Sequence, residues 1–447
     1  MNKTKNTTIK SLILHLTLLR HKLSHLERVW AEGGGRLVAV IAALCILPAY
    51  SRAQQLLPLD SVLSAVQRAN PALRQYDYRA RAKAAAVAGA TSWEAPRISA
   101  GYFMKPYSPP RSAEMASDRG MRMVGVEQMI PNPARQRARR AYLAGQAAVE
   151  QASQGALFNT LRSQARGLYF NQVILEKKQR VLDQSEQLLE FLLQIAQARY
   201  PYNQSSLADI YQVQSRVALL GNDHAELYGQ LRQNRIALNT LMARDPAAEF
   251  VVDTLLPAPS AALLPADTAA LAAARSDVRG LNEQLNVLRL SREVEANRRR
   301  PEFGIRYDHM NGIGPRPNQF TLMGMVTLPF APWSAREYRA NTAALGLEAQ
   351  AVQQQRASLL LDATGRLRTL QSELQTRQQQ VANFEANILP ALHKTYQVTL
   401  LAYEQNTAQL PAVIEAFDDW LRLRLRYLDT QNELLTLRVQ YDQELEQ

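Results

Sequence analysis

The sequence is poor in cysteine and histidine, with one Cys and six His among 447 residues. One cysteine excludes a disulfide scaffold and a cysteine-rich metal site. The histidines beyond the N-terminal region, His224, His309 and His393, are isolated in sequence, so we expect no metal centre. A nucleophilic Cys, a glycine-rich phosphate loop after a strand and a His-Glu metal motif are also missing. These absences predict a chain that is not an enzyme and binds no cofactor.

Long hydrophobic segments are missing too, apart from one short run near the N-terminus. Residues 37–47 are apolar, follow a basic stretch and precede the small-x-small pattern Ser51-Arg52-Ala53. This arrangement is typical of a secretory signal peptide, residues 1–53, cleaved after Ala53. No later window holds about 18 consecutive apolar residues, so we expect an exported protein without a membrane-spanning helix.

The order of sequence patterns repeats after about 200 residues. Residues 96–102 align with residues 301–307, and Tyr200 aligns with Tyr403. The exported chain is therefore predicted to be a tandem duplication. Its parts are a first structural repeat at 54–255, a linker at 256–265 and a second structural repeat at 266–447.

Each repeat contains a predicted pair of strands. In the second repeat Phe303, Ile305 and Tyr307 alternate with Gly304, Arg306 and Asp308, which gives one apolar and one polar face. Strands of about ten residues suit a tilted crossing of a bilayer. A surface hairpin of a soluble protein would show the same pattern. The strands are expected near 97–106, 120–130, 302–311 and 319–329.

Two very long helices follow the strand pairs. Proline is absent from residues 134–200, and Pro390 is the single proline in residues 335–402. Each predicted helix is about 100 Å long, and leucine recurs every seven residues, for example at Leu161, Leu168 and Leu175, which indicates supercoiled packing. The other faces are polar, as expected for a wall that is wet on one or both sides. Returning helices are expected near 207–243 and 410–446.

Four strands in one chain are too few to close a sheet. A sheet in lipid must close to satisfy its edge hydrogen bonds, and three copies would supply twelve strands, within the known range of barrels. The predicted fold is mainly α with a small β part, built from a duplicated helix-strand-strand-long helix-helix repeat. As a homotrimer it would form a 12-stranded outer-membrane β-barrel continued by a 12-helix periplasmic α-barrel.

The exported chain resembles the TolC-like outer membrane efflux protein family over nearly its whole length. The resemblance is carried by Asn70-Pro71, Pro96, Pro131, Pro301, Leu328-Pro329, Tyr403 and Ala416. It implies a homotrimeric channel in the outer membrane of a Gram-negative cell, extending into the periplasm. Such a channel docks to a periplasmic adaptor and an inner-membrane pump, and it passively conducts small molecules such as drugs, toxic compounds or metal ions.

The resemblance also implies a constriction at the periplasmic tip, often lined by acidic side chains of the returning helices. Asp209 and Glu415 occupy matching stretches and are our candidate gate residues. For Asp209 there is an alternative reading, because an acid is also favourable at a helix N-terminus.

Two further residue types mark the tips. The family usually has a glycine in each tip, whereas this chain has Asn203 and Asn406, which tolerate a left-handed backbone. Tyr200 and Tyr403 are expected to pack within the tips rather than contact a partner.

Methionine is concentrated in the hairpins, where eight of the ten occur. If Val124 and Val126 face lipid, alternation places the neighbouring methionines in the lumen. Thioethers suit Cu(I) and Ag(I), although methionine also fills irregular surfaces. The candidate lumen-facing residues are Glu127, Arg306, Asp308, Met121 and Met123.

The basic run Arg135, Arg137, Arg139 and Arg140 resembles a nucleic-acid patch when read in isolation. Export and its position beside a predicted membrane strand favour an interfacial or subunit-contact role, so we expect no nucleic-acid partner. Other readings of the whole chain stay open. They are a heavy-metal (Cu/Ag-type) efflux channel, a type I protein secretion duct and, without a pore, a periplasmic coiled-coil structural or adaptor protein.

Overall fold

The computed structural model describes residues 56–107, 119–255 and 267–446, except 315 and 330. The predicted signal peptide, 1–53, and the predicted linker, 256–265, lie outside the described residues. The described residues all belong to one unit, Leu56–Gln447. They are mostly helical, with one four-stranded sheet and one short two-stranded sheet.

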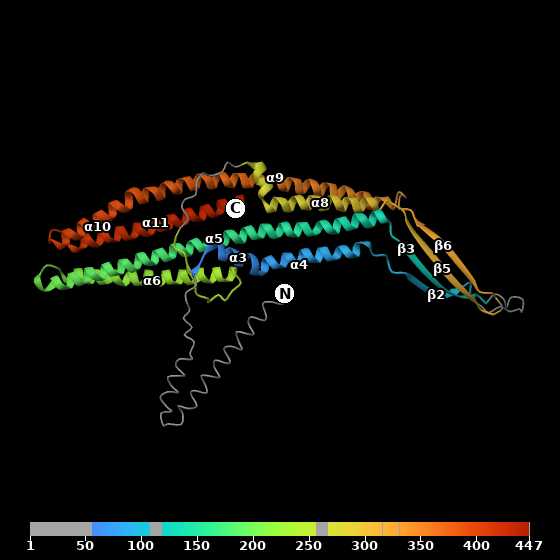
Figure 1. Cartoon of the computed structure of the whole chain (residues 1–447), viewed down its shortest axis with the longest axis horizontal. Helices are drawn as coiled ribbons and strands as arrows, with labels where there is room; N and C mark the ends of the chain where they lie inside the picture. Colours follow the sequence, from blue (N-terminus) through green and yellow to red (C-terminus); the bar gives the residue numbers. More distant parts are fainter. Residues whose placement is uncertain (1–55, 108–118, 256–266, 315, 330, 447) are drawn as a thin grey trace, which may run out of the picture. The chain divides into compact units, whose positions relative to one another are not determined.

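The elements follow the predicted order twice (Figure 1). Those of the first repeat are β1 (Leu56–Leu57), α3 (Leu59–Ala69), α4 (Pro71–Ala86), η1 (Val87–Thr91), β2 (Arg97–Phe103), β3 (Met121–Ile130), α5 (Pro133–Arg199), η3 (Tyr200–Tyr202), α6 (Leu207–Leu241) and β4 (Val251–Val252). Those of the second are α7 (Thr268–Ala274), α8 (Ser276–Asn297), β5 (Glu302–Gly312), β6 (Gln319–Thr327), α9 (Ala335–Asn383), η4 (Phe384–Ile388), α10 (Leu389–Glu404) and α11 (Leu410–Leu445).

An Asn-Pro pair starts two of the helices of the first repeat. The Asn132 side chain accepts a hydrogen bond from the Ala134 N–H at 2.9 Å, and Asn70 does the same for Ala72 at 2.9 Å. Proline then occupies the first helical position, where its missing N–H has no cost. The Asn132 amide also donates to the Pro301 carbonyl at 3.1 Å. This bond fixes the start of α5 beside the start of β5.

The helices form a wall one layer thick, with α5 as its spine. Near the sheet α5 packs between α4 and α8, and α8 packs against α9; toward the helix tips α5 packs between α6 and α11. The sheet lies at one end of α5 and the hairpin tips lie at the other (Figure 1). Among the described residues, no helix combines the length and apolar character that a bilayer crossing requires.

The predicted seven-residue spacing matches the buried seam. Leu161, Leu175, Leu182 and Leu189 of α5 are buried, as are Leu367 and Leu374 of α9. The largest apolar cluster lies in the half of the wall nearer the tips, where the Tyr396 and Trp420 rings stack with centroids 5.7 Å apart. The wall is therefore held by a narrow apolar seam and broadens into an aromatic core toward the tips.

The prediction of a single second long helix is wrong. The sequence predicted one helix over 335–402, but α9 ends at Asn383 and the π-helical turn η4 separates it from α10. Pro390 lies in the first turn of α10 and cannot donate a backbone hydrogen bond. A π turn absorbs one extra residue in a helix, so the helical run continues through η4 into α10 instead of ending.

A second difference from the sequence-based prediction is a short parallel strand pair that packs against the middle of the helical wall. β1 pairs with β4 in parallel, and Val62, Val66 and Phe250 join a buried cluster with α5. The Tyr169 hydroxyl accepts a hydrogen bond from the Asp253 N–H at 3.2 Å. The sequence analysis did not predict this parallel pair, because two-residue strands carry no recognisable period.

Candidate functional sites on the sheet and at the hairpin tips

The four-stranded sheet joins the two repeats. Its strand order is β2-β3-β5-β6 and every neighbouring pair is antiparallel. The central β3–β5 pairing places Glu127 opposite Arg306, and β5–β6 places Arg306 opposite Met323. Within the described residues β2 and β6 each pair on one side only. Their outer edges therefore present unpaired backbone groups.

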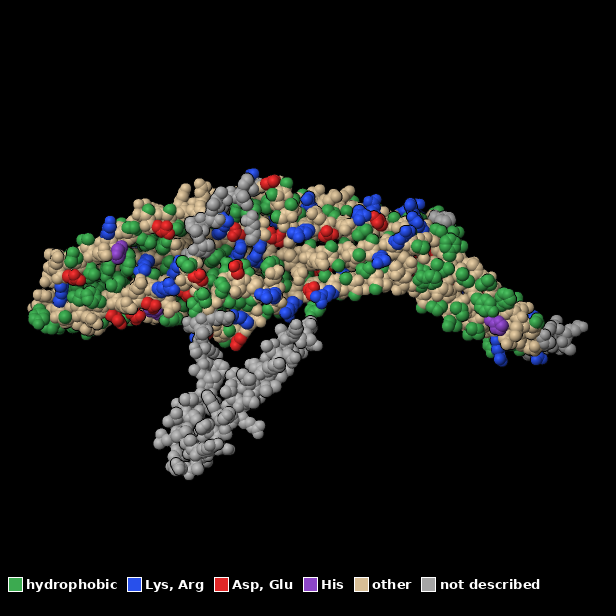
Figure 2. Space-filling view, in the orientation of Figure 1, with side chains coloured by type: hydrophobic (Ala, Val, Ile, Leu, Met, Phe, Trp, Pro, Cys, Tyr) green, Lys and Arg blue, Asp and Glu red, His purple; other side chains and the backbone are tan. Residues whose placement is uncertain are grey.

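One face of this sheet is apolar and exposed. Hydrophobic side chains cover the sheet in the space-filling view (Figure 2). Their exposed fractions run from 43% at Val126 to 74% at Ile98. Soluble monomers rarely expose so continuous an apolar surface. Arg122, Gln128 and His309 share this face. Besides Val126 and Ile98, its exposed hydrophobic members are Tyr102, Val124, Phe303, Ile305, Tyr307, Phe320, Leu322 and Val326.

The opposite face carries a charged network. Arg306 Nε lies 2.9 Å from Asp308 Oδ2, and its Nη1 lies 3.8 Å from Glu127 Oε2. Arg97 Nη1 lies 3.8 Å from the other oxygen of Glu127. Asp308 is only 3% exposed, because the sheet leaves it room at Gly125, where a Cβ would overlap its carboxylate. All four charges are thereby paired on one side of the sheet.

Methionines share this polar face. Met123 lies directly opposite Met310, and Gly304 separates Met129 from Met325. A Cβ at Gly304 would lie 2.6 Å from Met129 Sδ and 3.0 Å from Met325 Cε, so both thioether chains occupy space over the glycine. The predicted residues Glu127, Arg306, Asp308, Met121 and Met123 all lie on this face; that it lines a lumen stays a prediction.

Both hairpin tips close with the same backbone turn. The Asn203 N–H donates to Tyr200 O and the Gln204 N–H to Arg199 O; the second tip repeats this pattern 203 residues later, from Asn406 and Thr407. Asn203 and Asn406 are left-handed, with φ of 58° and 60°. This is the Schellman motif with asparagine in its usual glycine position. The left-handed turn expected of both asparagines is therefore present.

Arg199 of the first tip forms hydrogen bonds to the second tip. It donates from Nη1 to Tyr403 O at 2.7 Å and from Nη2 to Glu404 O at 2.8 Å, and its guanidinium lies 4.5 Å from the Tyr403 ring centroid. These carbonyls end helix α10, where a cation is favourable. Tyr403 is buried at 2% exposure, whereas Tyr200 is 46% exposed. Tyr403 thus packs within the tip, and Tyr200 packs far less than we expected.

The two candidate gate acids are placed differently. Asp209 forms a capping box with Ser206: its Oδ2 accepts from the Ser206 N–H at 2.8 Å, and its own N–H donates to Ser206 Oγ at 3.1 Å. The helix-start reading of Asp209 is therefore realised. Glu415 is exposed on α11 and lines a groove. Their roles in a gate stay predictions.

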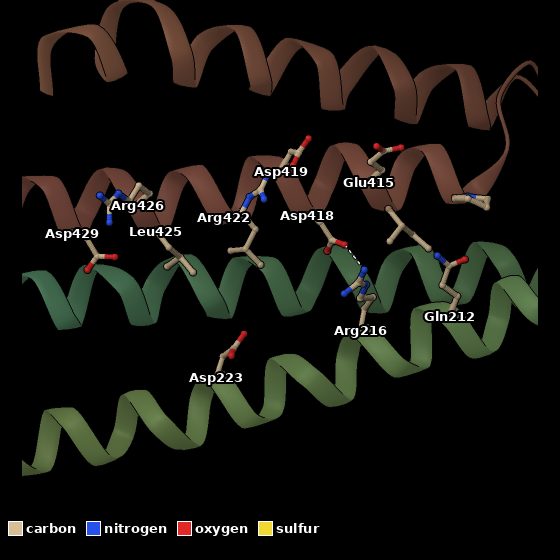
Figure 3. A pocket seen from close by; sticks show the side chains of 13 residues that line it. Gln212, Arg216, Asp223, Glu415, Asp418, Asp419, Arg422, Leu425, Arg426 and Asp429 are labelled. Carbon is tan, nitrogen blue, oxygen red and sulfur yellow. Dashed lines mark hydrogen bonds and ion pairs between the residues drawn. The ribbon is translucent and has the colours of Figure 1, made fainter. Parts of the chain in front are cut away.

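That groove lies near the tips between α6 and α11 and has a volume of about 850 Å³. Arg216 of α6 and Asp418 of α11 point toward each other (Figure 3), with Nη2 and Oδ2 2.7 Å apart. Burial raises the pKa of Asp418, and the charge of Arg216 opposes that rise. The sequence analysis missed this ion pair and the Arg199 contacts, because each joins residues about 200 positions apart.

Comparison with protein families finds no match, and comparison with curated proteins also finds none. Solved structures do match. The outer-membrane channel OprN shares 16% identity over 87% of this chain and 89% of that chain, with a TM-score of 0.70. The outer membrane protein VceC of Vibrio cholerae shares 13% identity over 87% and 95%, with a TM-score of 0.67.

The Campylobacter jejuni outer membrane channel CmeC is similar to the same extent, with 14% identity, coverage of 87% of this chain and 85% of that chain, and a TM-score of 0.68. Identities this low establish the fold alone. The chain therefore has the TolC-like fold that the sequence resemblance predicted: long helices with a small antiparallel sheet.

The Arg216–Asp418 pair predicts a pH-dependent stability effect. Because burial raises the pKa of Asp418 above its unfolded value, the charged carboxylate costs stability above that pKa, and the cost disappears as the pH falls through it. Arg216→Ala removes the compensating charge and is expected to lower stability at pH 7 by about 1 kcal/mol or less. The loss should shrink as the pH is lowered from 7 toward about 4, near the ordinary pKa of an aspartate, as measured by thermal unfolding.

The control for this prediction is Arg289→Ala. Arg289 pairs with Glu293 on the same helix, α8, but its side chain is 60% exposed, so its removal should change stability little at either pH. An Arg216→Ala effect that is equal at pH 7 and at about pH 4 would contradict the role of Asp418.

Proposed function

We propose that the protein is the outer-membrane channel of a tripartite efflux system, conducting small molecules passively from an inner-membrane pump and its adaptor to the outside. The observation that carries this proposal is the exposed apolar face of a sheet in a chain with the fold of outer-membrane channels. A lipid-facing surface explains that face. A periplasmic coiled-coil adaptor without a pore offers no reason for it.

Closure of the sheet supports a homotrimer. A sheet within lipid must satisfy all its backbone groups, and the open edges of β2 and β6 offer complementary partners on neighbouring copies. Three copies form a barrel of twelve strands, of a size seen in outer-membrane proteins. The polar face, with Glu127, Arg306 and Asp308, then lines its interior. The one-layer helical wall continues the duct into the periplasm.

The helix tips are the proposed constriction and the docking end for the adaptor. Asp209 and Glu415, repeated by the trimer, place acidic side chains near this end, which favours cations. Asn203, Asn406 and the neighbouring tyrosines shape the turn itself. Asp209 combines this charge with its capping bonds.

A soft metal cation, Cu(I) or Ag(I), is a second candidate cargo. Six methionines lie on the polar face of the sheet: Met121, Met123, Met129, Met310, Met323 and Met325. Met123 and Met310 face each other across neighbouring strands, and Met129 and Met325 flank Gly304. Thioethers are ligands that soft cations prefer. Within the channel class, no contact in the described residues favours protein secretion over these cargoes.

The lipid-facing assignment predicts different outcomes on the two faces of the sheet. Ile305→Arg places a charge on the apolar face, where it costs about 2–4 kcal/mol at the bilayer midplane. We expect fewer heat-resistant trimers in outer-membrane fractions. The matched control is Met323→Glu on the polar face, where the new charge lies opposite Arg306, with 42% exposure against 51% for Ile305. Equal tolerance of both variants would argue for a soluble sheet.

The gate assignment predicts a change in ion selectivity. Glu415→Ala removes an exposed acid from each subunit, so the cation preference of single channels in planar bilayers should weaken. Glu348→Ala, an exposed acid on α9, is the control and should leave the reversal potential unchanged. An unchanged reversal potential for Glu415→Ala would remove that residue from the gate.

The metal cargo predicts a selective phenotype. Met129→Leu with Met325→Leu conserves volume but removes both thioethers over Gly304. Cells relying on this variant should become more sensitive to silver and copper, with unchanged sensitivity to organic toxicants, in growth-inhibition assays. Met242→Leu, at the buried C-cap of α6 with 3% exposure, is the control. Unchanged metal tolerance would exclude this methionine pair from transport.

A further inference from the structure

The junction between sheet and helices carries basic and aromatic residues that the proposed channel does not use. Lys and Arg side chains gather there on the face shown in Figure 2, next to the apolar surface of the sheet. We define the junction belt as Trp93, Arg137, Arg140, Arg299, Arg300 and Trp333. All six residues are exposed. The four arginines form no ion pair within the described residues.

One ion pair orients the start of α5. Arg135 pairs with Glu302 across 2.5 Å, and Glu302 lies on the same face of β5 as Arg306 and Asp308, because strand residues alternate. At about 100° per residue, Arg137 lies about 200° and Arg140 about 140° around the helix from Arg135. Both therefore lie on the opposite side of the wall, which continues the apolar face of the sheet.

The distance of Arg137 and Arg140 from the sheet matches the position of a lipid headgroup layer. Arg137 and Arg140 follow the first residue of α5 by about 6 and 11 Å at the rise of a helix. The polar layer on each side of a bilayer is about 5–8 Å thick, and arginine side chains extend several ångströms toward it. Arg299 and Arg300 occupy the turn just before β5. The arginines thus lie where the apolar surface ends.

Trp93 and Trp333 also lie where the apolar surface of the sheet ends. Trp93 is 59% exposed just before β2, and Trp333 is 80% exposed between β6 and α9. Exposed tryptophan is unusual on a wetted surface, but it is enriched where membrane and water meet. The remaining tryptophan of the described chain, Trp420, packs in the aromatic core far along α11.

We propose that the junction belt binds the headgroups of anionic phospholipids in the periplasmic leaflet of the membrane. This inference rests on the proposed outer-membrane function. The guanidinium groups pair with lipid phosphates, which they recognise in a bidentate manner, and the indole rings lie at the boundary of the acyl chains. Anionic lipid is the chosen occupant because exposed, unpaired positive charge lies directly beside an apolar surface.

The test uses the full-length trimer in mixed micelles containing either phosphatidylglycerol or phosphatidylcholine. Phosphatidylglycerol is expected to raise the thermal stability of the trimer more than phosphatidylcholine does. Arg137→Gln with Arg140→Gln should remove most of this difference and weaken phosphatidylglycerol binding about fivefold or more. The matched control is Arg232→Gln with Arg368→Gln, which should behave like the unmodified trimer. Both arginines are exposed on helices and form no ion pair within the part of the chain that the structure describes.

Three outcomes would overturn the inference, and they are distinguishable. A trimer that inserts into vesicles but responds equally to both lipids refutes the lipid site and leaves the channel function standing. A variant that dissociates to the same extent in both lipids shows that the arginines contact a neighbouring subunit. A protein that does not enter vesicles at all, with no quenching of Trp93 and Trp333 by brominated lipid, refutes the membrane function as well.

Discussion

The open backbone edges of the four-stranded sheet are the constraint on which the rest of the structure depends. β2 and β6 each have one partner within the chain, while the sheet exposes one continuous apolar face. Each unpaired backbone group would cost several kcal/mol in lipid. An apolar face and open edges are compatible in a membrane only when copies of the chain complete one another. For the proposed outer-membrane channel, assembly would thus be a requirement of the sheet.

The helical wall meets a different requirement, because a layer one helix thick has little apolar surface to bury. Hydrogen bonds between buried and half-buried amide side chains fix the register of the helices instead. The Asn432 amide donates to Asn171, Asn171 to Asn234, and Asn234 to Gln172, at 3.0 to 3.1 Å. This chain of hydrogen bonds crosses α11, α5 and α6. A satisfied polar network permits few alternative registers, which a leucine seam alone would tolerate.

The sequence could predict the features that depend on neighbouring residues. Alternation at Phe303, Ile305 and Tyr307 predicted the apolar face of β5, and the proline-free run predicted α5 to within one residue at each end. The sequence shows that Pro390 interrupts the second long helical run. Whether a proline bends a helix, ends it or produces a π turn depends on the residues packed around it. The contacts of Arg199 and the Arg216–Asp418 pair needed the spatial order of helices, which no local pattern contains.

The two predicted repeats differ at the tips by one side chain that contacts the other tip. In the shared Schellman motif, Ala402 occupies the place that Arg199 holds in the first repeat. Arg199 caps the end of α10 and covers the Tyr403 ring, and an alanine cannot return that contact. Tyr200 accordingly remains exposed while Tyr403 is buried. In a ring of three chains, junctions with this arginine would alternate with junctions that lack it, so two equivalent backbone turns produce two unequal contacts.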